Sequence, residues 1–483
     1  MGEIYMRSEG NLIDLGDDDP SLRLALHSIG LLAKEMCEDV EGPDSVLLAY
    51  VDGGIAANTA PAPDIDETAL MNFFARAWFQ LFISPQLFDS DGLHAAAHLW
   101  QFVDVKNGKG RWPDGRNTDM TALAALSQNS NASERKDRIF AVLGLLEPPP
   151  TAFAEEDSLL IKPDYTKTVQ EIYRDATRFA IRESGHLHCL RATNHRSDAA
   201  LVLDGFPSWA FRLDQLYDEA FDAEMFDLHF HADSHETLYG GNTEASFAGA
   251  DVLSVAGMFV STVSRISEVF SPGVWEDDDK LMTLLRSVKE MVGLYADPLE
   301  LADVTSVTGE WMIESQPDRC SAGLALTLMA GQKGEGGPPT SENIAVFGQY
   351  IDQCMSTEHS VGHGDSRGTD YQRSPRRVLE SACRNRRVFV DDKGQIGLGP
   401  RATMEGDCLA ILFSSSTPTL LRWQKDCPNE VRYKQDCGHI DYMGHQAQYV
   451  GPAYVHSLMQ GLWVDLSKSS ALLEDMATVY ELV

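Results

Sequence analysis

GQIGLGPRATMEGDCLAILFSSSTPTLLRW, residues 394–423, alternates short apolar runs with turns that contain Gly or Pro. Gly and Pro mark turns, and short runs of branched or apolar residues between such turns are typical of strands. A turn at 392–394 precedes the stretch, and QYVGPAYV at 448–455 reads as a further strand. The pattern therefore predicts a β-rich C-terminal module over residues 376–483.

Four segments outside this module carry apolar residues at helical spacing: 21–36, 66–82, 167–184 and 280–292. Apolar side chains three or four residues apart predict one face of an amphipathic helix. Residues 251–266 are rich in branched side chains and predict a strand. We therefore predict an α+β fold, a mostly helical body followed by the β-rich module. Its predicted regions are 1–150, 151–375 and 376–483.

Composition narrows the possible partners. Acidic residues outnumber basic residues, 73 against 39 among 483, for a formal net charge of −34. Binding to nucleic acid needs a basic surface, so this charge argues against such a partner. No apolar run reaches the roughly 18 residues that predict a membrane span. The eight cysteines form no Cys-x-x-Cys pair and the start shows no secretory signal, so we expect reduced thiols and a cytoplasmic protein.

Motifs for phosphate binding, nucleophilic catalysis and zinc proteases are not found in the sequence. Two histidine pairs, His186 with His188 and His229 with His231, could share one face of a strand and bind a metal ion. A polar surface segment explains the second pair more simply. We therefore predict neither a metal site nor a cofactor.

Two further features leave alternatives open. Asp137 and Arg138 stand just before an apolar run, where a structural ion pair is commoner than an acid–base group. The aromatic stretch 206–226 includes Trp209 and Phe211, which fit either the core or an apolar ligand pocket.

Several segments in order resemble the fungal heterokaryon-incompatibility (HET) domain proteins. They are KDRIFAVLGLLEPP at 136–149, IKPDYTKTVQEIYRD at 161–175, the stretch at 394–423 and YVGPAYVHSLMQG at 449–461. The resemblance implies that residues 1–150 are a helical remnant of the HET domain. It also implies that the C-terminal module is a small barrel-like element of the family scaffold.

The departures from the family pattern carry functional meaning. The TIR-like N-terminal half, where the resemblance would place NAD cleavage, has no counterpart, so NAD hydrolysis is not expected. Leu81, Ile83 and Leu87 replace an expected Arg, Trp and Glu. Ser261 stands where an Asp is common. Replacing several members of a polar network together avoids unpaired buried groups and leaves a more apolar interior.

Two functions follow from this resemblance. One is a cofactor-free enzyme of fungal secondary metabolism that binds an apolar small molecule and catalyses a cyclisation, a pericyclic step of Diels–Alder type or an isomerisation. The other is heterokaryon incompatibility, meaning allorecognition and cell-death signalling. The candidate catalytic residues are Asp137, Arg422 and His456, and the candidate substrate-binding residues are Trp78, Phe79, Trp209 and Phe211.

Overall fold

The computed structural model describes residues 120, 134–140, 143, 162–193, 195, 205–211, 230, 232–233, 245–296, 319–331, 339–355, 375–424, 445–459, 461 and 477–483. The predicted helices at 21–36 and 66–82, with Trp78 and Phe79, lie outside these residues. The chain divides into two compact units. The first comprises Met1–Ala180, Leu213–Tyr217 and Ser366–Tyr371, and the second comprises Ile181–Arg212, Asp218–Asp365 and Gln372–Val483.

The described part of the first unit contains the short helix α8 (Asp137–Phe140) and most of α10 (Val169–Ser184), which confirms the helix predicted at 167–184. Thr168 and Glu171 form a reciprocal cap at the start of α10. The main-chain N–H of Thr168 donates to Oε2 of Glu171 at 2.7 Å, and the N–H of Glu171 donates to Oγ1 of Thr168 at 3.2 Å. This arrangement satisfies main-chain groups that have no partner within the helix.

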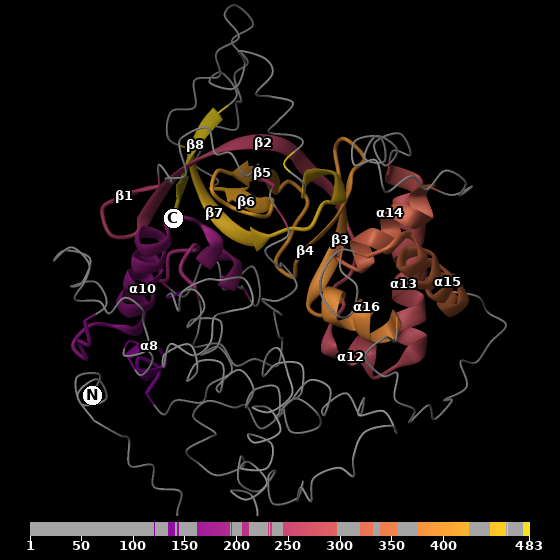
Figure 1. The fold of residues 1–483 in the computed structure, drawn as a ribbon, viewed down its shortest axis with the longest axis horizontal. Coiled ribbons are helices and arrows are strands. Elements are labelled where there is room, and N and C mark those ends of the chain that lie inside the picture. The colour runs from indigo at the N-terminus through magenta and orange to yellow at the C-terminus, as the bar shows by residue number, and fades with distance from the viewer. Residues whose placement is uncertain are drawn as a thin grey trace, which may run out of the picture. The chain divides into compact units, whose positions relative to one another are not determined.

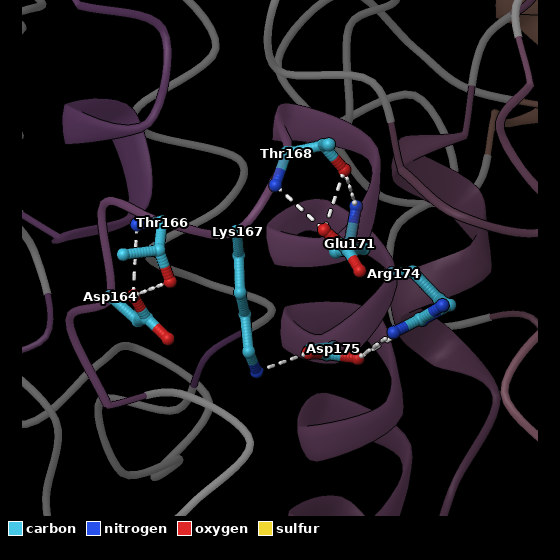
Figure 2. A network of polar contacts seen from close by, with 7 residues as sticks. All are labelled: Asp164, Thr166, Lys167, Thr168, Glu171, Arg174 and Asp175. Carbon is cyan, nitrogen blue, oxygen red and sulfur yellow. Dashed lines mark hydrogen bonds and ion pairs between the residues drawn. The ribbon is translucent and has the colours of Figure 1, made fainter.

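A buried carboxylate lies one turn further along α10. Asp175 is 3% exposed and contacts Nζ of Lys167 at 2.7 Å and Nε of Arg174 at 3.0 Å. Figure 2 shows both cations converging on this carboxylate, next to the Thr168–Glu171 cap. Two cations and the cap thus fix the entry of the chain into α10.

Helices of the second unit enclose one apolar cluster. They are α12 (Pro272–Trp275), α13 (Asp278–Tyr295), α14 (Arg319–Leu328), α15 (Ser341–Met355) and α16 (Pro375–Cys383). The helix predicted at 280–292 is α13, which begins earlier because the Asp277 side chain accepts hydrogen bonds from the N–H groups of Asp279 and Lys280. The described part of this unit also contains two short 3-10 helices, η4 (His188–Ala192) and η8 (His456–Leu458).

The second unit also holds an eight-stranded mixed sheet. Its strands are β1 (Ser246–Ala248), β2 (Val252–Ile266), β3 (Arg386–Asp391), β4 (Ile396–Pro400), β5 (Cys408–Leu412), β6 (Thr419–Trp423), β7 (His445–Pro452) and β8 (Ala477–Leu482). The order is β4-β3-β2-β5-β6-β7-β8, with β1 beside β2. The pair β7–β8 is parallel and the other pairs are antiparallel.

Strand β2 connects the β3–β4 hairpin with the strands β5 to β8 in this sheet. It pairs with β5 and β8 through its first two thirds and with β3 near its end, and a register shift occurs in each of the ladders to β5 and β3. Because β8 pairs with both β7 and β2, the pairings run from β2 through β5, β6, β7 and β8 back to β2. Figure 1 shows β3 and β4 beside the helices α12–α16.

The α+β class is thus confirmed, and the strands predicted at 251–266 and within 387–455 are β2 to β7. The sheet takes β1 and β2 from before residue 376, so the β-rich part is larger than the predicted C-terminal module. One apolar cluster packs α12–α16 against β3 and β4, and a second fills the space among the strands. No helix in the described part of the chain is long and apolar enough to cross a bilayer.

Candidate functional site

The predicted catalytic Asp137 begins α8 and accepts a hydrogen bond from the Tyr165 hydroxyl. Nζ of Lys136 donates to the carbonyl oxygen of Tyr165 at 2.9 Å, and the Phe140 ring meets the Tyr165 ring edge-on, with centroids 5.1 Å apart. The hydrogen bond to Asp137 is the main cause that raises the pKa of Tyr165 to about 12. The α8 segment and the segment before α10 therefore meet at Tyr165, and the hydrogen bond to Asp137 joins them.

The predicted catalytic Arg422 lies on β6 and binds Asp407, which is 2% exposed. Its Nε and Nη2 donate to Oδ1 and Oδ2 of Asp407 at 2.8 and 3.0 Å, and Nη2 also donates to the carbonyl oxygen of Ala402 at 2.6 Å. A bidentate pair of this kind fixes both side chains in one geometry. Arg422 therefore joins β6 to the turn before β5, and these donors serve the fold.

Both described substrate-binding candidates, Trp209 and Phe211, are fully buried at 0% exposed. Nε1 of Trp209 donates to the carbonyl oxygen of Asp251 at 3.1 Å, and its carbonyl oxygen accepts from Oγ1 of Thr193 at 3.3 Å. The Trp209 ring lies 5.8 Å from the Phe247 ring. A buried indole with its N–H satisfied is the arrangement expected of a core residue.

His456, the third predicted catalytic residue, begins η8 and pairs with a tyrosine. Its Nδ1 lies 2.9 Å from Oη of Tyr454, which is 1% exposed. Main-chain hydrogen bonds in both directions between Tyr454 and Leu398 fix the tyrosine backbone beside β4. The sequence indicated His456 but not Tyr454, because a partner two residues away depends on how the chain turns from β7 into η8.

The side chains packed around this pair are apolar. The Tyr454 ring lies 5.8 Å from the Phe230 ring and belongs to the cluster that contains Leu398 and Met459. Gly331, just after α14, presents bare backbone to the tyrosine: a Cβ there would lie 2.6 Å from Oη of Tyr454. The close approach of this hydroxyl thus depends on glycine.

Burial sets the protonation of both groups. It lowers the pKa of His456 from 6.5 to about 4 and raises the pKa of the Tyr454 hydroxyl well above its usual value. At neutral pH the imidazole is therefore uncharged and the phenol keeps its proton. A neutral His–Tyr pair in apolar surroundings can hydrogen-bond to a ligand or move one proton.

A second buried group, Asp391 at the end of β3, was not indicated by the sequence. Its Oδ1 accepts from the N–H groups of Lys393 and Gln395 at 3.0 and 2.7 Å. Burial raises the pKa of this carboxyl, and the nearness of the Ser261 hydroxyl acts in the opposite direction. Oδ2 of Asp391 and Oγ of Ser261 lack a well-formed partner among the described residues. The sequence signal next to it was the predicted turn at 392–394, which indicates a hairpin but no catalytic or binding role.

The His186 and His188 rings stack with centroids 5.0 Å apart and planes 12° from parallel. Imidazole nitrogen lone pairs lie in the ring plane, so two stacked and nearly parallel rings cannot direct them at one ion in this arrangement. Among the described residues, no group of three or more His, Cys, Asp or Glu side chains could hold a metal ion. His229 and His231 lie outside those residues.

Comparison of this chain with protein-family models, with curated proteins and with solved structures finds no match.

Proposed function

We propose that this protein is a cofactor-free enzyme that acts on an apolar small molecule on a scaffold resembling the HET-domain proteins. The reaction is a cyclisation, a pericyclic step of Diels–Alder type or an isomerisation, and the compartment is the cytoplasm. The observation that carries the proposal is the Tyr454–His456 pair, with 2.9 Å between Oη and Nδ1 and an uncharged imidazole.

This pair supplies what such a reaction needs from a protein. A hydrogen bond made in apolar surroundings is stronger than the same bond in water, and a fixed donor or acceptor costs no reorganisation during the reaction. Among the described residues, Nε2 of His456 has no hydrogen-bond partner. That nitrogen is therefore the atom we assign to the ligand.

The scaffold is part of the proposal. The continuous pairing from β2 through β5, β6, β7 and β8 back to β2 supports a small barrel-like module. Its β7 leads directly into the segment that carries Tyr454 and His456. A rigid strand before the site would hold both side chains in one geometry.

Gene deletion in the source organism, a fungus under this proposal, tests the function. We expect one metabolite to disappear while an isomer of equal mass or an uncyclised relative accumulates, as measured by mass spectrometry of the extract. The wild-type gene and a Lys289→Met control should restore the metabolite, and His456→Gln should not. Unchanged metabolites together with altered strain compatibility would reject the enzyme and favour the incompatibility protein.

A further inference from the structure

The buried hydroxyl of Tyr454 fixes where the protons of the Tyr454–His456 pair lie. A tyrosine hydroxyl has one hydrogen, and burial leaves that hydrogen dependent on a protein acceptor. In the described part of the chain, Nδ1 of His456 is the acceptor within reach of Oη. The hydroxyl also lies close to Gly331, where an added Cβ would come within 2.6 Å of Oη.

The two possible proton arrangements differ in what they leave unsatisfied. If Nδ1 of His456 donated to Oη, the Tyr454 hydrogen would have no acceptor in the described surroundings, at a cost of about 1–3 kcal/mol. If Oη donates to Nδ1, every buried donor of the pair is satisfied. The remaining proton then sits on Nε2 of a residue that is partly exposed as a whole. Nε2 is also not among the fully buried polar atoms that lack a hydrogen-bond partner. We infer that Tyr454 donates to Nδ1 of His456 and thereby fixes Nε2–H as a hydrogen-bond donor for the carbonyl oxygen of an uncharged ligand.

Charge supports this ligand class. Burial lowers the pKa of His456, and no charge among the described residues contributes to that shift. A carboxylate or phosphate bound at Nε2 would lose its water without gaining a counter-charge, whereas a ketone, ester or amide oxygen needs a single donor. Within the proposed function, on which this inference rests, a donor to a carbonyl favours activation of an enone-type partner in cycloaddition over removal of a proton.

The proton arrangement can be measured without any substrate. In full-length protein labelled with nitrogen-15 histidine, we expect the His456 signals to show a protonated Nε2 and an unprotonated Nδ1, with His456→Gln giving the assignment. In Tyr454→Phe, His456 should be a mixture of the form with the proton on Nδ1 and the form with the proton on Nε2. Tyr449→Phe, which removes a buried hydroxyl bonded to the carbonyl oxygen of Leu190, should leave the wild-type tautomer unchanged. A protonated Nδ1 in the wild-type protein would overturn the inference.

The ligand class is tested with two small probes, cyclohexenone and cyclohexanecarboxylate, titrated to millimolar concentration. We expect the enone to shift the Nε2–H resonance of His456 and the carboxylate to leave it in place. A response to the carboxylate, or to neither probe, would overturn the ligand class. Because these readouts need no turnover, a failed tautomer assignment is distinguishable from a failed gene-deletion test of the enzyme.

Discussion

Arg422 on β6 and Asp407 before β5 form a bidentate ion pair in which Nε and Nη2 meet the two carboxylate oxygens at 2.8 and 3.0 Å. The Asp407 carboxylate is buried and also accepts the N–H of Met404 at 2.8 Å. The pair thus fixes the turn that leads into β5. Removing one partner of a buried pair leaves an uncompensated charge, which costs more than the pair itself contributes.

Arg422→Met is therefore expected to lower the free energy of unfolding by about 3 kcal/mol, because Asp407 remains buried and loses its cation. Urea unfolding of the full chain measures this difference. The double variant Arg422→Met/Asp407→Asn removes the stranded charge and should recover part of the loss. If the single variant were as stable as the wild-type protein, the assigned structural role would be wrong.

The matched control is Lys289→Met. Nζ of Lys289 contacts Asp352 at 2.9 Å, and these side chains are 45% and 58% exposed. An exposed pair contributes at most about 1 kcal/mol. If Arg422→Met lowers the free energy of unfolding much more than Lys289→Met does, the loss comes from the burial of the pair and not from the loss of an ion pair as such.

Local signals predicted much of this fold. The β3–β4 hairpin follows from Asp392-Lys393-Gly394, and Gly394 has the positive φ of +81° that such a turn needs. Strand β2 was predicted as a strand, but its two register shifts and its partners β5, β8 and β3 were not. Alternation of side chains fixes which face a residue occupies and carries no information about which distant strand lies beside it.

Gly331→Ala is expected to destabilise the protein and disturb the Tyr454–His456 pair. Gly331 has φ +66°, where a Cβ costs roughly 1–2 kcal/mol, and the added carbon would lie 2.6 Å from Oη of Tyr454. Thermal unfolding should show a lower midpoint, and the His456 tautomer should become mixed. Gly348→Ala is the control: it lies within α15 with open space around its Cβ position and should raise stability by up to about 1 kcal/mol.

Asp391→Asn should stabilise the protein at neutral pH. The pKa of Asp391 is raised above 3.8 in the folded state, so its ionised form opposes folding above the folded pKa. Stability from this group therefore increases as the pH falls through that pKa. Asparagine keeps an oxygen for the N–H groups of Lys393 and Gln395 and adds a donor towards Ser261. We expect a gain of about 1 kcal/mol at pH 7 in urea unfolding; a loss would show that the carboxylate is stabilised there.

Thr168→Ala should loosen the first turn of α10. It removes the Oγ1 that accepts from the N–H of Glu171, at a cost of about 1 kcal/mol. Hydrogen exchange should quicken at the first amides of α10. Thr283→Ala, an exposed site inside α13, removes a hydroxyl that bonds the Asp279 carbonyl oxygen and should leave exchange in α10 unchanged. Equal protection of α10 in both variants would contradict the capping role.

The sequence predicted single residues of the candidate site but not the contacts between them. His456 and Arg422 were predicted as candidate catalytic residues, but their partners Tyr454 and Asp407 were not. Asp407 lies fifteen residues from Arg422 along the chain, and the two side chains meet because β5 and β6 pair. Whether a polar residue has a catalytic or a structural role therefore depends on its tertiary contacts.

His456 should make the stability of the wild-type protein fall in mild acid. Its pKa is about 4 when folded against an ordinary 6.5, so below pH 6.5 the unfolded chain binds a proton that the folded site does not. Stability from this group is present above pH 6.5 and is lost as the pH falls towards about 4. Between pH 7 and pH 5 the wild-type protein should lose about 1–2 kcal/mol more than His456→Gln, measured by urea unfolding. Asp391 titrates in both proteins, so its opposite effect cancels in this difference, and equal pH slopes would show that the imidazole protonates in the folded state.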